Sequence, residues 1–184
     1  AGLVKGFTQL LLDMEEDKSK ISIIEKIKNH SEKLINIIES ASRLSRLEST
    51  DKLELKKVDM VPIIEQVVDD FKYQIDKKHM NVEIRTDKKC PAFANDIIED
   101  VLSNLLSNAI KYSPENSKII IDVQNAGDFW KFSFIDTGEG ISDMDKVRLF
   151  ERFERADKSN IKGTGIGLAI VKKIVELHDG DVGA

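Results

Sequence analysis

The chain has 184 residues, of which 41% are hydrophobic and 33% are charged, and its formal net charge is −5. This apolar fraction is typical of a globular protein and excludes general disorder. The acidic balance argues against a nucleic-acid binder that works through bulk charge. The one cysteine, Cys90, excludes an internal disulfide and is typical of a reducing, cytoplasmic setting. No apolar run approaches the ~20 residues of a membrane span, so membrane attachment is expected only through a parent segment outside this sequence.

Residues 1–50 predict a hairpin of two helices. Apolar residues recur at intervals of three and four over 3–14 and 24–45, on either side of a polar break at 13–20. In the second segment this repeat is a heptad seam, formed by Ile24, Ile27, Ser31, Leu34, Ile38, Ala41 and Ser45. The apolar stripe is wider than a two-stranded coiled coil needs, and a lone hairpin buries too little surface to be stable. We therefore expect the hairpin to dimerise into a four-helix bundle.

Residues 51–184 have the pattern of a separate α+β domain. A short strand is expected at 53–58, and Asp59 is expected to cap a helix that carries Pro62 in its first turn. The elements expected further along are a strand at 82–84, a helix at 96–112, a hairpin of strands at 119–123 and 129–135, and a last helix at about 164–178. Together they predict helices on one face of a mixed sheet.

The segment 104–112 (NLLSNAIKY) is the most informative part of the chain. On a helix, Asn104 and Asn108 lie on one face, and Lys111 and Tyr112 continue it. Amide oxygens for Mg²⁺, an ammonium group for phosphate and a ring for base stacking would suit a nucleotide. A solvated helix face is the alternative, although two asparagines within a helix are unfavourable without some other reason.

Two glycine-rich segments follow. The first, 136–141 (DTGEGI), comes directly after an apolar strand, and there the backbone could approach a flat or anionic group while Asp136 accepts hydrogen bonds. An ordinary turn is the alternative. The second, 163–168 (GTGIGL), opens the last helix, where N–H groups and the helix dipole would hold phosphate. A dinucleotide-binding fingerprint fails here, because its final glycine is absent and no βαβ unit surrounds the segment.

Between these two segments lies 150–155 (FERFER), followed by a polar strip. Two aromatic anchors and a polar strip between glycines indicate a hinged lid over a site. A surface loop with phenylalanine anchors is the alternative.

Taken together, these segments resemble the sensor histidine kinases of two-component signalling. The segment 104–114 (NLLSNAIKYSP) is similar to that family's N box, and 136–141 to its first glycine box. The segment 150–156 (FERFERA) is similar to its phenylalanine box, and 163–180 to its second glycine box, in the family's order. The resemblance implies a dimeric helical bundle followed by an α/β-sandwich ATP-binding domain of the Bergerat, or GHKL, type.

The resemblance also implies individual roles. Asn108 would coordinate Mg²⁺ with help from Asn104, Lys111 would touch phosphate, and Arg155 would neutralise charge on the γ-phosphoryl group. Asp136 would accept the adenine amino group, and Tyr112 would stack near the base. The full set of implied ATP contacts is Asn108, Tyr112, Asp136, Gly138, Gly140, Ile141, Gly163, Thr164, Gly165, Gly167 and Leu168.

The sequence departs from the family pattern at both ends. The phosphoacceptor histidine, in a motif like H-E-L-R-T-P-L, is expected before Ala1, so this chain is expected to bind ATP without phosphorylating itself. His30, His79 and His178 are not expected to replace that histidine. After His178 the family continues with a closing hairpin of the sheet, and only DGDVGA stands here.

The implied activity is transfer of the γ-phosphoryl group of ATP to a histidine, and then to an aspartate of a response regulator receiver domain. The expected assembly is a homodimer without nucleic acid. One alternative is a related ATPase of the gyrase or mismatch-repair type, and another is a non-catalytic ATP-binding or docking module. Such ATPases usually carry a glutamate where Asn104 stands, and an asparagine cannot act as a general base. That difference and the helical hairpin favour the kinase.

Overall fold

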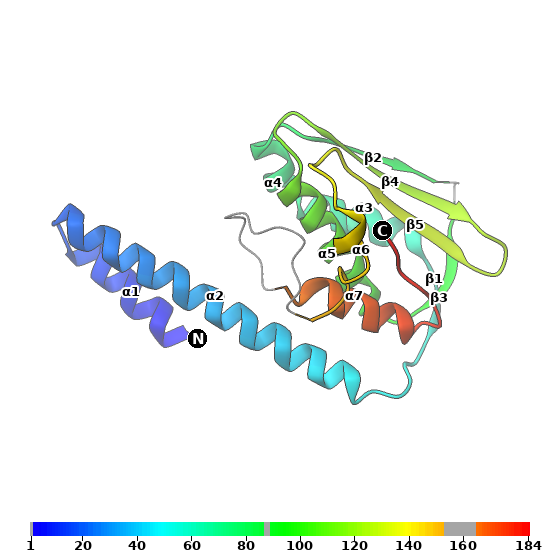
Figure 1. Ribbon diagram of the computed structural model, residues 1–184, viewed down its shortest axis with the longest axis horizontal. Coiled ribbons are helices and arrows are strands. Elements are labelled where there is room, and N and C mark those ends of the chain that lie inside the picture. The colour runs from blue at the N-terminus through cyan, green and yellow to red at the C-terminus, as the bar shows by residue number, and fades with distance from the viewer. Residues whose placement is uncertain (1, 87–88, 153–164) are drawn as a thin grey trace.

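The computed structural model describes residues 2–86, 89–152 and 165–184. Figure 1 shows a hairpin of two helices, α1 (Gly2–Met14) and α2 (Lys18–Glu48), that projects from a body of helices and strands. Both helices are present as the apolar repeat predicts, whereas the four-helix bundle needs a second copy and stays a prediction. Among the described residues, no helix is long and apolar enough to cross a membrane.

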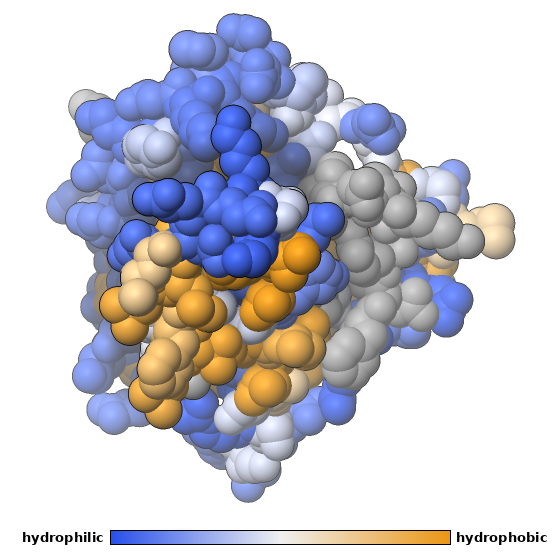
Figure 2. Space-filling view, turned by 90° about the vertical axis from the view of Figure 1, so that its left-hand side faces the viewer, coloured by the Kyte–Doolittle hydropathy of each residue, from blue (hydrophilic) through white to orange (hydrophobic). Residues whose placement is uncertain are grey.

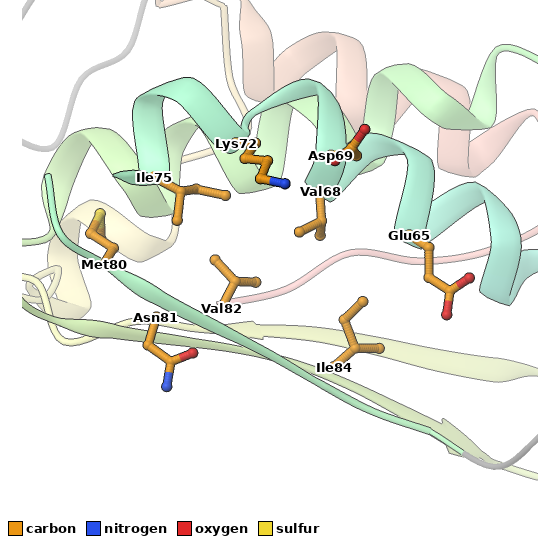
Figure 3. Close-up of a pocket in the computed structure, with 9 residues that line it drawn as sticks. All are labelled: Glu65, Val68, Asp69, Lys72, Ile75, Met80, Asn81, Val82 and Ile84. Atoms are coloured by element: carbon orange, nitrogen blue, oxygen red, sulfur yellow. The ribbon is translucent and has the colours of Figure 1, made fainter. Parts of the chain in front are cut away.

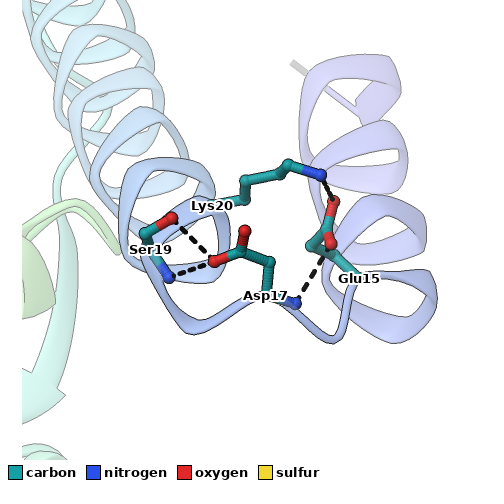
Figure 4. Close-up of polar contacts among 4 residues, drawn as sticks. All are labelled: Glu15, Asp17, Ser19 and Lys20. Carbon is teal, nitrogen blue, oxygen red and sulfur yellow. Dashed lines mark hydrogen bonds and ion pairs between the residues drawn. The ribbon is translucent and has the colours of Figure 1, made fainter.

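The turn between α1 and α2 is held by local polar contacts (Figure 4). Asp17 caps α2, because its Oδ1 accepts hydrogen bonds from the backbone N–H and the hydroxyl of Ser19, at 2.8 and 2.7 Å. The carboxylate of Glu15 accepts from the backbone N–H of Asp17 at 3.1 Å and pairs with Lys20 at 3.3 Å. These hydrogen bonds favour the charged forms, so the pKa values of Asp17 and Glu15 lie below their ordinary values.

The body contains a small two-stranded sheet. Strand β1 (Lys56–Asp59) pairs antiparallel with β3 (Pro91–Ala94). The strand expected at 53–58 therefore begins later, at Lys56. Strand β3 has no clear signal in the sequence, because proline and alanine have low strand propensity and only the pairing with β1 makes this segment a strand.

Asp59 joins this small sheet to α3 (Met60–Asp70). Its Oδ1 accepts hydrogen bonds from the backbone N–H groups of Cys90 at 3.0 Å and Val61 at 3.2 Å, which confirms it as the helix cap. The bond from Cys90, followed by that from Val61, holds the pKa of Asp59 below its ordinary value. The apolar spacing continues through Phe71 to Ile75 and predicts a single helix. Instead it is interrupted at Phe71, whose N–H bonds to Val68 in a tighter turn, and α4 (Lys72–Lys77) follows.

The main sheet has the strand order β2-β4-β5 and is mixed, as expected. Strand β2 (Asn81–Arg85) is parallel to β4 (Lys118–Asn125), and β4 is antiparallel to β5 (Trp130–Ile135). The β4–β5 turn is confirmed, with Gly127 at a φ of +83° and its N–H bonded to Asn125 Oδ1 at 2.9 Å.

Helices cover one face of this sheet, among them α5 (Ile98–Tyr112) (Figure 1). Alternate residues of β4 are buried in one core cluster with side chains of α3 and α5, including Ile119, Ile121, Met60, Ile64, Leu106 and Ile110. A short helix that the sequence analysis did not predict, α6 (Asp143–Lys146), follows the first glycine-rich segment. The last helix, α7 (Gly167–Glu176), begins three residues later than expected, and residues 153–164 lie outside the described part of the chain.

The hairpin and the body share a second core cluster. Leu44 of α2 is buried among side chains of α5 and α7, including Val101, Ile170 and Ile174. Ion pairs between Arg43 and Asp100 and between Glu48 and Arg152 flank this contact. The C-terminal part of α2 therefore packs on the same two helices that carry the candidate site.

Candidate functional site

Four of the predicted site residues lie along α5, and we call them the α5 row: Asn104, Asn108, Lys111 and Tyr112. Their spacing of three and four places them along one face of the helix. The opposite side of α5 is anchored by buried apolar residues, including Leu102, Leu106 and Ile110. At 1.5 Å per residue, the row extends over about 12 Å, so α5 is a rigid support for a line of polar groups.

The first glycine-rich segment meets the row at Tyr112. Gly138 N–H donates to Asp136 Oδ1 at 2.8 Å. A Cβ atom on Gly138 would lie 2.9 Å from both Asp136 Oδ1 and the backbone oxygen of Tyr112, so glycine is needed for this close approach. The second oxygen of the Asp136 carboxylate has no partner within the described ranges and lies at an exposed position. Tyr112, Asp136 and Gly138 therefore form one end of the site.

Lys111 and Tyr112 contact each other at this end. The Lys111 ammonium group donates to the Tyr112 hydroxyl at 3.0 Å and lies 4.5 Å from the ring centroid. Tyr112 is 38% exposed, so both a cation and an aromatic face are accessible beside Asp136.

The start of α7 meets the row at Asn104. The Asn104 Nδ2 group donates to the backbone oxygen of Asp100 at 2.7 Å. A Cβ atom on Gly167 would lie 2.7 Å from Asn104 Oδ1, so the first residue of α7 must be glycine for this side chain to keep its position. One N–H of the Asn104 amide is thus bonded to α5, and the amide oxygen lies close to the first residue of α7.

Asn108 is half-buried, and its side chain has no hydrogen-bond partner in the part of the chain that the structure describes. Within those same residues, no group of three or more His, Cys, Asp or Glu side chains could hold a metal ion. Mg²⁺ commonly takes one or two protein ligands and completes its shell with waters and substrate phosphates. A free amide oxygen without a carboxylate cage therefore fits a Mg²⁺ ion that binds together with a nucleotide.

Most of the remaining predicted residues belong to the two glycine-rich segments. Gly140 (φ +78°) and exposed Ile141 follow Gly138, and Gly165 (φ +70°) precedes α7. Leu168 packs in the cluster that α2, α5 and α7 share. Three predicted residues, Arg155, Gly163 and Thr164, lie outside the described residues.

A hollow of about 430 Å³ lies elsewhere, between α3, α4 and β2 (Figure 3). Val68 of α3 points across it toward Val82 and Ile84 of β2, and the Asp69 carboxylate points away from it. None of the residues that line it is a predicted site residue. Because it lacks converging polar groups, this hollow is a weaker nucleotide site than the α5 row.

Two residues without a signal in the sequence hold parts of the α5 row in place through hydrogen bonds. Asp100 accepts the amide of Asn104 through its backbone oxygen, and Lys78 donates to backbone oxygens at the end of α5. Lys78 stands next to Lys77 at the end of a charged helix, so no signal in the sequence distinguishes the two lysines.

The chain is similar to several known proteins. Residues 94–184 match the family model described as histidine kinase-, DNA gyrase B- and HSP90-like ATPase. The sensor-like histidine kinase SenX3 of Mycobacterium tuberculosis is 31% identical over 180 residues, covering 94% of this chain and 43% of SenX3. The sensor histidine kinase WalK of Bacillus subtilis is 32% identical over 172 residues, covering 85% of this chain and 27% of WalK. The chain thus spans less than half the length of these relatives.

Solved structures of similar fold include full-length ShkA in complex with AMPPNP, with a TM-score of 0.78 and 24% identity over 98% of this chain and 38% of that one. The catalytic domain of the histidine kinase ThkA has a TM-score of 0.58 and 30% identity, covering 67% of this chain and 82% of that one. Acinetobacter baumannii AdeS, also a histidine kinase, has a TM-score of 0.70 and 26% identity over 96% of this chain and 83% of its own.

Proposed function

The chain belongs to the sensor histidine kinases of two-component signalling, and from that membership we propose that it binds Mg-ATP along the α5 row. The γ-phosphoryl group would pass to a histidine of a dimerisation helix, and then to an aspartate of a response regulator receiver domain. The observation that carries the proposal is the close approach of both glycine-rich segments to the row, Gly138 at Tyr112 and Gly167 at Asn104.

The adenine ring would bind at the Tyr112 end. The free oxygen of Asp136 would accept a hydrogen bond from the exocyclic amino group, while the other oxygen stays bonded to Gly138 N–H. A carboxylate accepts but does not donate at neutral pH, so it favours adenine over a base that presents a carbonyl there. The exposed Tyr112 ring supplies a stacking surface.

The phosphates would bind along the rest of the row. Asn108 would hold Mg²⁺ through its free amide oxygen, with Asn104 Oδ1 nearby, and the N-terminal end of α7 would favour the negative charge. Bound Mg²⁺ would neutralise charge on the phosphate oxygens. Lys111 would touch phosphate, and Arg155, from the segment that resembles the phenylalanine box, would neutralise charge on the γ-phosphoryl group.

In the transfer, the bond from the γ-phosphorus to the bridging oxygen breaks as a bond to an imidazole nitrogen forms. ADP leaves, and the imidazole proton passes to solvent. The protein supplies position and charge neutralisation rather than a covalent group. Asn104 cannot take a proton from water, which supports a kinase over an ATPase that needs a glutamate at this position.

The homodimer is supported by the exposed face of the hairpin. Figure 2, which looks at the side from which the hairpin projects, shows apolar side chains gathered on the surface. The exposed apolar residues of the two helices are Leu3, Val4, Phe7, Leu10, Leu11, Met14, Ile23, Ile27, Leu34 and Ile38. Three of them, Ile27, Leu34 and Ile38, belong to the predicted heptad seam. Burial of so large an apolar stripe against a second copy would form the four-helix bundle.

Phosphoryl transfer can be tested by incubation of the complete protein, with the segment that carries the acceptor histidine, and γ-labelled ATP. The expected product is a label that is labile in acid and stable in base, which identifies phosphohistidine. ATP binding without any such label would refute the kinase proposal and support the non-catalytic docking module.

A further inference from the structure

We infer that Lys78 is a positioning residue for the nucleotide site and acts through the last turn of α5. The inference rests on the proposed function, because it concerns how Lys111 and Tyr112 are held in place for ATP. Lys78 itself lies behind the row and belongs to none of the segments that resemble the family's nucleotide-binding boxes.

The Lys78 ammonium group donates three hydrogen bonds to the end of α5. Its acceptors are the backbone oxygens of Ile110 at 2.7 Å, Lys111 at 3.3 Å and Ser113 at 2.9 Å. The last carbonyl groups of a helix have no partner within the helix, and a cation near them is favoured by the helix dipole. Hydrogen bonds from a charged donor are also stronger than neutral ones. Lys78 therefore holds carbonyl groups that precede Tyr112, at Ile110 and Lys111, and the carbonyl group of Ser113 that follows it.

The backbone of Lys78 is itself held against the segment that follows α5. The Lys78 carbonyl accepts from Asn116 N–H at 2.9 Å, and Asn81 N–H donates to the Ser117 carbonyl at 2.9 Å. His79 and Asn116 have left-handed φ angles of 52° and 60°, so both turns are tightly defined. The α4–β2 turn and the α5–β4 turn thus form one rigid joint, from which the ammonium group reaches α5.

Two contacts connect this joint to the site. The backbone oxygen of Tyr112 is the atom that a Cβ on Gly138 would meet at 2.9 Å, and the Tyr112 hydroxyl accepts from Lys111 at 3.0 Å. If the peptide groups around Tyr112 rotate, the ring, the Lys111 ammonium group and the Gly138 contact all move together. Loss of the Lys78 bonds should therefore change the shape of the adenine end without removing any group that binds ATP.

The test compares Lys78→Met and Lys78→Arg with the control Lys77→Met, using the 184-residue chain. Lys77 is exposed in α4, and its side chain has no hydrogen-bond or ion-pair partner within the described ranges. The affinity for Mg-ATP is measured by calorimetry at a temperature where each variant is folded, and the amide resonance of Gly138 is followed by NMR. We expect Lys78→Met to bind about tenfold more weakly, equivalent to about 1.4 kcal/mol, and to shift the Gly138 resonance. Lys77→Met should change neither, and Lys78→Arg should restore both in part.

Wild-type affinity and an unchanged Gly138 resonance in folded Lys78→Met would overturn the inference and leave Lys78 as a stabilising cap only. If Lys78→Met does not fold, Lys78→Gln keeps an uncharged amide with two N–H donors in place of the three of the ammonium group, and it should give a smaller change of the same sign. No change would overturn the inference equally. If the wild-type chain binds no nucleotide, the proposed function fails, whereas the Gly138 resonance still tests the positioning.

Discussion

Gly138 and Gly167 are both required by close contacts, but the contacts differ in kind. At Gly138 a Cβ atom would meet the backbone oxygen of Tyr112, and at Gly167 it would meet the end of the Asn104 side chain. A backbone carbonyl in a helix cannot move without disturbing the helix, whereas an asparagine side chain can rotate. The two glycines therefore have different consequences for stability and for binding.

We predict that Gly138→Ala destabilises the fold by about 1–3 kcal/mol, the usual range for overpacking, and that Gly167→Ala destabilises it less. Gly167→Ala should nevertheless weaken Mg-ATP binding, because Asn104 is displaced. Urea denaturation and calorimetry measure the two effects. Gly183→Ala is the control, since a Cβ there has no atom within 4 Å. A larger loss of stability for Gly167→Ala than for Gly138→Ala would contradict this distinction.

The lowered pKa of Asp59 predicts how the stability of the fold depends on pH. Its folded pKa is lowered by the hydrogen bonds from Cys90 and Val61 N–H, so its carboxylate stabilises the fold above the ordinary carboxyl pKa of about 3.9. That stabilisation is lost as the pH falls through the lower, folded pKa. Asp59→Ala should therefore lower Tm at pH 7, and the difference from wild type should shrink below about pH 4. A difference in Tm that stays constant from pH 7 to pH 3 would show that the charge is not responsible.

At the scale of elements, the long helices and the β4–β5 hairpin could be predicted from the sequence because their periodic patterns are strong. Strand β3 and helix α6 could not, since both are short, and β3 depends on its partner β1. The break at Phe71 also has no local signal, because apolar spacing continues across it. Of the site, the α5 row follows from helical spacing, but the contact of Asn104 with Gly167 depends on tertiary packing between distant segments.

The hairpin exposes the apolar residues of its predicted heptad seam, which burial against a second copy would stabilise. Leu34 is 61% exposed in the single chain and would be buried in the proposed dimer. We predict that Leu34→Glu converts the dimer to a monomer, because it would bury an unpaired charge at the interface. Sedimentation or light scattering gives the mass of the assembly. Asn36→Glu adds the same charge at an exposed position outside the predicted heptad seam and should leave the dimer intact. A wild-type chain that is monomeric at all accessible concentrations would contradict the proposed bundle.

At the scale of the whole molecule, the hairpin packs against the ATP-binding domain through a common apolar core. Leu44 is 5% exposed and packs with α5 and α7, whereas the flanking Arg43–Asp100 pair is partly exposed. Exposed ion pairs contribute about 0–1 kcal/mol, and a buried leucine contributes more, so the apolar contact dominates. Asp100 also binds Asn104 through its backbone oxygen, so the docked hairpin lies one residue away from the site.

The central claim is that the α5 row and the two glycine-rich segments form one ATP site, and calorimetric titration of the chain with Mg-ATP tests it most directly. The wild-type chain should show saturable binding, Asn108→Ala should abolish it, and Asp136→Asn should lose the preference for ATP over GTP. Asp128→Asn, in the exposed β4–β5 turn, is the matched control and should bind as wild type does. Unchanged nucleotide affinity and selectivity in both Asn108→Ala and Asp136→Asn would contradict the account.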